Sequence, residues 1–447
     1  MAIAGNPVPP ITHHHLLVFL LQVGILLLLA IALGRLAVRF GMPSVVGELA
    51  VGVLLGPSLL DTVAPDLSGW LMPKDPEQVH MLDAFGQFGV LMLVALAGMH
   101  MDLGLIRRRG AAAAGISAGG LAVPLGLGVV AGLLIPTKLL VDGGDRGVFM
   151  LYLGVAMCVS ALPVIAKTLM DMNLIHRNVG QLTMTAGMVD DAFGWLMLSI
   201  VSALATTGFR AGQVGLSVLY LALVIVVAAF VGRPVVRFAM RAAARASDAG
   251  TVPATAAVIV VLGSAATHAL RLEAVFGAFV CGILIGLVAK EHRARLAPLN
   301  TVTMSVLAPI FFAIAGLRVD VTALADPVVL VAALVLLLVA VVGKFVGAYA
   351  GARASRLGHW EGIALGAGMN ARGVIEIVVA MVGLRLGILT VEMYTIIVLI
   401  AIATSLMAPP ILRSAMVRVE LTADEELRQT EQRDLTMVTR SGPRQGA

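Results

Sequence analysis

Residues 45–56 read VVGELAVGVLLG and residues 275–286 read VFGAFVCGILIG, so the chain carries two copies of one glycine-marked apolar pattern. The copies align without a gap, and all three glycines match. A second pair follows in the same order, with AGMHMD at 97–102 and AGLRVD at 315–320. Two ordered matches favour an internal duplication over chance similarity between glycine-rich helices.

The composition places both copies in a membrane. Of 447 residues, 59% are hydrophobic and only 13% are charged, and the mean hydropathy is +0.99. These values exclude a soluble globular protein, a disordered chain and a nucleic-acid binder. We therefore expect an all-α polytopic membrane protein.

Apolar runs of membrane-spanning length predict thirteen helices. They cover residues 16–34, 44–60, 82–99, 111–135, 148–169, 181–206, 215–239, 252–270, 273–289, 299–317, 328–350, 361–383 and 391–412. The repeated stretches fall in the second and ninth spans and in the third and tenth. Because seven is an odd number of spans and successive spans alternate in direction, the copies are expected in opposite orientations. This arrangement is typical of secondary transporters.

This pattern predicts five parts. Residues 1–15 form an external N-terminal segment, 16–206 the first six-helix repeat, 207–251 a linker with helix 7, 252–412 the second repeat, and 413–447 a disordered cytoplasmic tail. Lys and Arg gather in alternate loops, which places the N-terminus outside and the C-terminus in the cytoplasm. We expect an integral protein of a bacterial plasma (inner) membrane.

Among the ionisable residues of the predicted spans, six need an explanation. They are Glu48, Asp190, Asp191, Lys344, Arg372 and Glu376. Each such group costs roughly 2.5–3.5 kcal/mol at mid-bilayer, so they are expected to face one another or water. Four acids and two bases sum to a formal charge of −2, which favours a cation site. The position of Glu48 near the start of a short span leaves its role open.

Asp190 and Asp191 are neighbours on the sixth span. Adjacent helical positions point about 100° apart, so one carboxylate can contact the mobile ion while the other contacts a neighbouring helix. Two carboxylates this close titrate as a coupled pair, and a tunable proton acceptor is what proton-coupled exchange requires. For Lys344 we expect a pair with Asp190.

Two spans look broken in the middle. Pro163 follows Ser160 in the fifth span and frees backbone carbonyl groups. The twelfth span carries GAGMNARG at 366–373, which includes Asn370. These spans are also seven apart, and paired half-helix ends line the midplane site of many transporters. Arg372 and Glu376, one turn apart, are expected to form a local ion pair.

These residues together resemble the second family of the monovalent cation:proton antiporter superfamily, the sodium or potassium/proton antiporters. The carriers of the resemblance are Val46 to Leu49 with Gly52 and Gly56-Pro57, Ala97-Gly98, Ser160 to Leu169, Asp190-Asp191, Phe311 to Asp320, Lys344, and Gly368 to Gly373. The stretches at 160–167 and 373–377 are more similar to its plant cation/proton exchanger branch.

The resemblance implies an elevator-type antiporter and a homodimer that serves pH homeostasis. It implies that Asp191 carries the proton and, transiently, the transported Na⁺ or K⁺. Asp190 would pair with Lys344, and carbonyl groups near Ser160, Pro163 and Asn370 would help to bind the cation. An Asp-Asp pair implies electrogenic exchange, whereas the plant branch usually begins its pair with Asn, so the stoichiometry and the ion stay open.

Other functions remain as alternatives at this stage. A cation channel or uniporter, or an exporter of a larger cationic or ionophore-like substrate, would use the same negative midplane. An intramembrane aspartyl protease needs two facing aspartates, whereas Asp190 and Asp191 diverge. We therefore expect no enzyme activity and no cofactor. The expected partners are protons, Na⁺ or K⁺ and the lipid bilayer, with no nucleic acid and no nucleotide.

Overall fold

The computed structural model describes residues 11–72, 75–101, 103–161, 165, 168–169, 172, 174, 176–207, 211–246, 248, 250–270, 272–288, 294–422 and 425–426. For 103–109, 206–207 and 211–218 it describes the backbone alone. Every regular element in this part of the chain is a helix, as the sequence predicts.

The elements follow one another in this order: α1 (His13–Arg39), α2 (Ser44–Leu55), α3 (Leu60–Val63), α4 (Pro65–Leu71), α5 (Pro76–Met99), α6 (Leu103–Leu134), η1 (Thr137–Leu139), α7 (Arg146–Cys158), α9 (Asn178–Thr207), α10 (Ala211–Val227), η2 (Ala228–Gly232), α11 (Arg233–Arg245), α12 (Thr251–Ala269), α13 (Ala274–Val288), α14 (Ala297–Val302), η4 (Thr303–Leu307), α15 (Ala308–Gly316), η5 (Val321–Ala325), α16 (Pro327–Ala354), α17 (His359–Met369), α18 (Val374–Arg385) and α19 (Val391–Met416).

Ten helical stretches among the described residues are long and apolar enough to cross a membrane. The pair α17 and α18 passes the same test together, with a bend of 44° at its break, and gives an eleventh span. Two further predicted spans, 148–169 and 273–289, overlap the shorter apolar helices α7 and α13. The count of thirteen, and the five parts derived from it, stay predictions.

The chain divides into two compact units. The first unit comprises residues 1–93 and 297–322. Its core joins side chains of α1, α2, α5 and α15, namely Leu26, Ala30, Val51, Leu82, Ile310, Ala313 and Ile314. Close packing of these helices is possible because glycines replace larger residues where two backbones meet.

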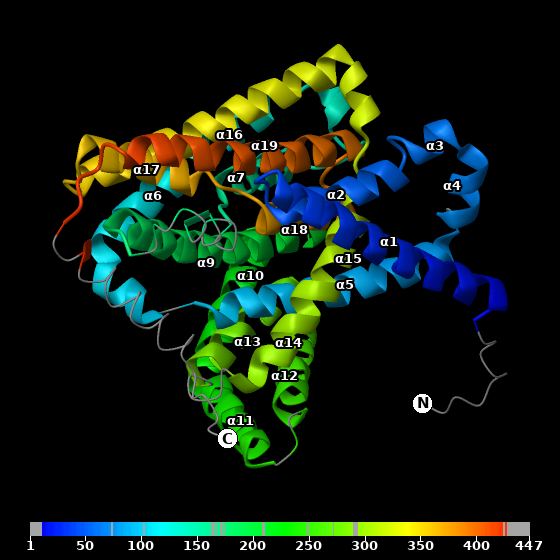
Figure 1. Cartoon of the computed structure of the whole chain (residues 1–447), viewed down its shortest axis with the longest axis horizontal. Coiled ribbons are helices and arrows are strands. Elements are labelled where there is room, and N and C mark those ends of the chain that lie inside the picture. Colours follow the sequence, from blue (N-terminus) through cyan, green and yellow to red (C-terminus); the bar gives the residue numbers. More distant parts are fainter. Residues whose placement is uncertain are drawn as a thin grey trace, which may run out of the picture. The chain divides into compact units, whose positions relative to one another are not determined.

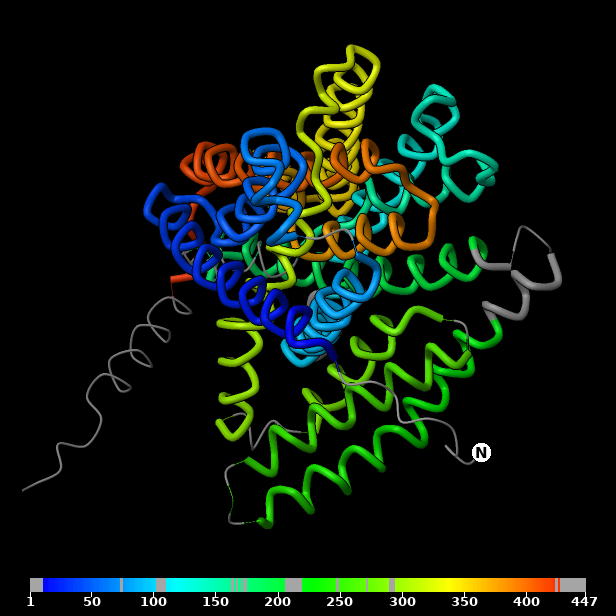
Figure 2. Tube along the Cα trace, turned by 90° about the vertical axis from the view of Figure 1, so that its right-hand side faces the viewer, coloured from blue at the N-terminus to red at the C-terminus, as the bar shows by residue number. Residues whose placement is uncertain are grey.

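The second unit comprises residues 94–296 and 323–447 and contains most of the predicted intramembrane charges. Figure 1 shows α16, in yellow, beside α19, in orange to red. In Figure 2, α11 and α12 form a hairpin of adjacent green coils. A core of small and branched residues from α6, α9, α16, α17 and α19 surrounds the break between α17 and α18.

The two copies of the repeated pattern make matching contacts within their own units. In the first unit, a Cβ on Gly52 would overlap the carbonyl oxygen of Ala313. In the second, a Cβ on Gly282 would overlap the carbonyl oxygen of Ala95. Gly52 aligns with Gly282, and Ala313 aligns with Ala95. Both copies of the pattern therefore place the same glycine at a close helix crossing.

The crossing of α6 and α16 depends on small residues in the same way. A Cβ on Gly347 would overlap the carbonyl oxygen of Gly119, and one on Gly351 would overlap that of Gly115. The glycines at 343, 347 and 351 therefore form a small-residue face on α16. Helices that approach so closely hold Lys344, which lies on α16 between these glycines, in a fixed position.

We expect Gly119→Ala to destabilise the protein by about 1–3 kcal/mol, because the added methyl group forces α6 and α16 apart. Gly126→Ala, two turns away on the same helix, provides the control, since no atom lies within 4 Å of a Cβ there. Thermal unfolding in detergent measures both. A melting temperature for Gly119→Ala equal to that of Gly126→Ala would contradict the close crossing.

Candidate functional site

The two adjacent aspartates lie in the middle of α9, and both are buried. Asp190 is 0% exposed and Asp191 is 1% exposed. Two carboxylates on consecutive helical positions point in different directions, so each has its own surroundings.

Asp190 is held from three sides. Its Oδ1 accepts a hydrogen bond of 2.5 Å from the hydroxyl of Ser117 on α6. Its Oδ2 accepts one of 3.0 Å from Ser160 and forms an ion pair with Nζ of Lys344 on α16. Lys344 is itself 0% exposed. Because both charges are buried and bonded to each other, the pair is neutral as a unit and fixed in place.

Two interrupted helices meet beside this pair. The first, α7, ends at Cys158, and Val159 continues in an extended conformation. The second interruption, residues 370–373, separates α17 from α18. The two stretches are joined where the backbone N–H of Ala161 donates to the carbonyl of Ala371 at 3.2 Å. Ser160 adds a bond from its hydroxyl to the carbonyl of Met369 at 3.0 Å.

Two buried cations cover the C-terminal end of α7, where helical carbonyls lack partners within the helix. Nζ of Lys344 donates to the carbonyl of Cys158 at 2.6 Å. The guanidinium of Arg372 donates to the carbonyls of Ala156, at 2.9 Å, and of Met157. Positive charge is favourable at this negative end of the helix dipole, so both side chains stabilise the interruption itself.

Arg372 also forms an ion pair of 3.0 Å with Oε1 of Glu376 on the first turn of α18. Both side chains are buried, at 0% and 1% exposure. The hydroxyl of Ser405 on α19 donates to the carbonyl of Arg372. Two neutral pairs, Asp190 with Lys344 and Arg372 with Glu376, therefore lie within one region, and Asp191 adds a single negative charge when it is ionised.

Asn370, the last residue of the expected set, closes α17 as its C-cap. It is 1% exposed, and its side-chain oxygen is buried with no hydrogen-bond partner among the described residues. A buried carbonyl oxygen of this kind is costly unless it meets water or a cation. Pro163 lies outside the described residues.

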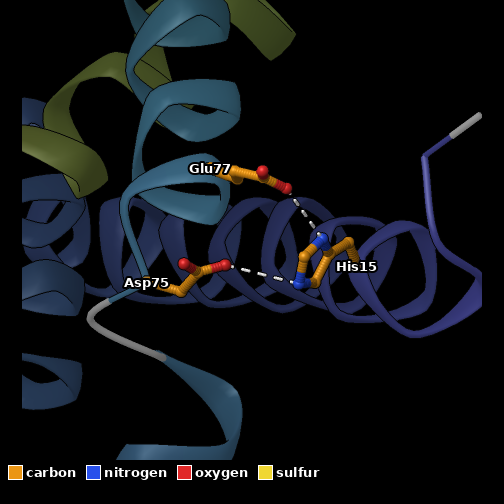
Figure 3. Close-up of side chains that lie close together, drawn as sticks. All are labelled: His15, Asp75 and Glu77. Carbon is orange, nitrogen blue, oxygen red and sulfur yellow. Dashed lines mark ion pairs between the residues drawn. The ribbon is translucent and has the colours of Figure 1, made fainter. Parts of the chain in front are cut away.

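Glu48 belongs to the first unit, where it is 9% exposed and faces Gly34 of α1. In the same unit His15 lies between two carboxylates (Figure 3), with Nε2 3.3 Å from Asp75 and Nδ1 3.5 Å from Glu77. These three residues offer ligand atoms within 4.8 Å of one another. Because Glu77 is largely exposed and both ring nitrogens already face carboxylates, we interpret the cluster as a polar link between α1 and the start of α5.

Sequence reasoning missed several partners. Ser117 donates to Asp190, and Ser405 donates to the backbone carbonyl of Arg372. Cys158 accepts from Lys344 through its carbonyl oxygen rather than its thiol. A signal for Ser117 was available, because it is the single hydroxyl residue in the sequence of the apolar helix α6. A backbone carbonyl leaves no such signal in the sequence.

The start of α9 is tied to the segment that follows α19. Arg177 donates to the carbonyls of Val419, at 2.9 Å, and Glu420, at 3.0 Å. Glu425 accepts from the backbone N–H of Asn178 at 2.6 Å and from that of Thr422 at 2.8 Å. Part of the predicted tail, 413–447, therefore contacts the helix that carries the aspartates. Residues 427–447 lie outside the described part of the chain.

This contact predicts a dependence on pH. Burial raises the pKa of Glu425, but hydrogen bonds from Asn178 and Thr422 and the charge of Arg177 outweigh it, so that the pKa lies below its usual value. A lowered folded-state pKa stabilises the fold above the unfolded value of about 4.3, and this stabilisation is lost as the pH falls through the folded pKa.

We expect Glu425→Gln to lower the melting temperature at neutral pH, and its difference from the wild type to shrink below about pH 4. Glu420→Gln serves as the control, because that side chain is exposed. Thermal unfolding across this pH range measures both variants. If the melting temperature of Glu425→Gln lies below that of the wild type by the same amount over the whole pH range, the ionised carboxylate is not the cause of the difference.

Comparison with known proteins points to one family. Residues 24–418 match the family model described as "Sodium/hydrogen exchanger, transmembrane". The matched range runs from within α1 to just beyond the end of α19 and includes both interruptions and the aspartate pair.

Two relatives and one solved structure extend this match. Cation/H(+) antiporter 15 of Arabidopsis thaliana is 30% identical over 381 residues, 83% of this chain and 45% of its own. The Na(+)/H(+) antiporter NhaS4 of Synechocystis is 28% identical over 400 residues, 89% of this chain and 96% of its own. The chain thus spans about half the length of the plant relative.

The fold is similar to that of the sodium proton antiporter MjNhaP1 from Methanocaldococcus jannaschii. The TM-score is 0.64 at 13% sequence identity, with 90% of this chain and 99% of that chain covered.

Proposed function

Because the chain belongs to the sodium/hydrogen exchanger family, we propose that it exchanges Na⁺ or K⁺ for protons, with Asp191 as the carboxylate that binds each in turn. The observation that carries this proposal is the buried pair of adjacent aspartates, of which Asp190 is already bonded to Lys344, Ser117 and Ser160. The neighbouring carboxylate supplies the titrating group.

The division of labour follows from the contacts of each residue. Asp190 and Lys344 position α9 against α6, α16 and the end of α7, and Lys344 cancels the charge of Asp190. Asp191 then acts as a single acid that binds either a proton or a monovalent cation. Competition for one group couples the two fluxes, because the charged empty site is costly to move through the bilayer.

Oxygen ligands for the cation are available in the interruptions, where Ser160 contacts both Asp190 and the carbonyl of Met369. Hard cations prefer carboxylate and carbonyl oxygens, and the side-chain oxygen of Asn370 is buried with no hydrogen-bond partner among the described residues. We propose that Asn370 and backbone carbonyls of the interruptions, with those near Ser160 and Pro163, complete the coordination. Arg372 and Glu376 keep a structural role.

We propose an elevator-type mechanism in a homodimer, with the interrupted helices moving as one body. Two observations support a rigid moving element: the hydrogen bond between Ala161 and Ala371, and the cations that cover the end of α7. We also propose that the chain is built from two inverted six-helix repeats, that its N-terminus lies outside, and that it resides in the bacterial inner membrane.

Reconstituted vesicles with a trapped pH-sensitive dye test this function. We expect Na⁺ or K⁺, added outside, to drive proton movement that saturates, and a lower pH to raise the cation concentration needed for half-maximal rate. Clamping the voltage then shows whether more than one proton moves per cation. Cation flux that neither saturates nor moves protons would show a channel instead.

A further inference from the structure

One face of α11 carries four arginines at every fourth position, Arg233, Arg237, Arg241 and Arg245. A spacing of four residues places these side chains on one stripe of the helix. They line a groove of about 520 Å³ together with Pro234, Phe238 and Ala242. The lining thus holds four positive charges and no acid.

Like charges one turn apart destabilise a helix unless a counterion neutralises them. Among the described residues, none of these guanidinium groups forms an ion pair with a carboxylate. A further cation lies close by, because Arg295 donates to the carbonyl of Ala244 at 2.6 Å. The acid that follows α11 in the chain, Asp248, accepts a hydrogen bond from Thr251. Within the part of the chain that the structure describes, no carboxylate neutralises the groove, so its charge favours the binding of an anion.

The position of the stripe along its helix shows which kind of anion fits. Residues 219–245 form one membrane-spanning stretch of 27 residues, about 40 Å long, against about 30 Å of hydrocarbon. Its last turns, with Arg237, Arg241 and Arg245, reach the headgroup layer. Large apolar side chains flank them, with Phe238 75% exposed and Phe230 78% exposed. Phosphate oxygens beside acyl chains match both features.

We propose that this groove binds the headgroup of an anionic phospholipid, such as phosphatidylglycerol, whose phosphate lies between the guanidinium groups. Arginine matches phosphate because its planar fork donates two parallel hydrogen bonds. A second copy of this chain is a poorer occupant, because a twofold axis would place the same four charges opposite one another. The apolar flank distinguishes a lipid from free phosphate.

The test compares lipid binding to the purified full chain and to Arg237→Gln/Arg241→Gln. Native mass spectrometry with added phosphatidylglycerol is expected to show affinity about 30-fold weaker in the variant, at about fivefold per arginine. Phosphatidylcholine binding should not change. The control is Arg35→Gln/Arg39→Gln, which removes two exposed arginines with the same spacing at the end of α1 and should change affinity less than threefold, or about 0.65 kcal/mol.

Three results would overturn the proposal. Equal phosphatidylglycerol affinity in the wild type and the groove variant would exclude the site. Thermal stabilisation of the wild type by inorganic phosphate as strong as that by phosphatidylglycerol would show a phosphate site without a lipid. A change of oligomeric state in the variant with lipid affinity unchanged would assign the groove to a second copy. A melting temperature without lipid equal to that of the wild type shows that the variant folds.

Discussion

Asp191→Asn is expected to reduce cation-driven proton movement in reconstituted vesicles to the level of vesicles without protein. An amide of the same size keeps the packing around a side chain that is 1% exposed, but it neither takes up a proton in this pH range nor supplies a negative charge to a cation. Both halves of the exchange are therefore lost together. The effect is larger than for any residue that only positions the site, because no other group in the proposal binds both substrates.

Asp142→Asn is the matched control, since it makes the same chemical change at an exposed position. It should retain the wild-type rate. Purified Asp191→Asn should also elute and melt like the wild type, which separates loss of transport from loss of fold. Cation-dependent proton movement that persists in Asp191→Asn would move the carrier role to another residue.

Arg372→Ala is expected to cost about 3–5 kcal/mol of stability, the range for breaking a buried ion pair by removing one partner. The change leaves Glu376 as a buried charge without its arginine and removes the donors to the carbonyls of Ala156 and Met157. These carbonyls lie in the last turn of α7, where they have no partners within the helix, so the interruption that supports Asp190 loosens. Thermal unfolding of the purified protein in detergent measures this loss.

Two comparisons identify the cause of the stability lost in Arg372→Ala. Arg385, which lies on the same helix as Glu376, pairs with Glu273 before α13. Because Arg385 is 41% exposed, the expected cost of Arg385→Ala is about 0–1 kcal/mol. The double change Arg372→Met/Glu376→Gln removes both buried charges and should lose less than Arg372→Ala alone. If Arg372→Ala has the same melting temperature as Arg385→Ala, the guanidinium group of Arg372 does not stabilise the interruption after α7.

The helical fold could be predicted because its signals are local. Apolar runs locate the helices, and repeated glycines mark crossings such as that of Gly52 with α15, where any larger residue collides with backbone. The geometry around Asp190 was also within reach. A lysine and an aspartate buried in different helices each need a partner, and the structure places Lys344 against Asp190.

The remaining details depend on backbone groups and on helix ends, which sequence patterns do not encode. Lys344 donates to the backbone carbonyl of Cys158, and every residue type carries such a carbonyl. The contact of Glu425 with Asn178 joins residues 247 positions apart, so a polar segment that reads as a solvated tail includes a stretch bonded to α9. The bend between α17 and α18 was expected from its glycines, whereas the role of Arg372 at the end of α7 was not.

Proton release on cation binding tests the central claim most directly. Purified protein in weakly buffered detergent solution is mixed with NaCl or KCl, and the change of pH is recorded against choline chloride. If a proton and a cation share the Asp191 carboxylate, the wild type releases up to one proton for each cation bound, and Asp191→Asn releases none. Saturable cation binding without proton release, or equal release from Asp191→Asn, would contradict the account.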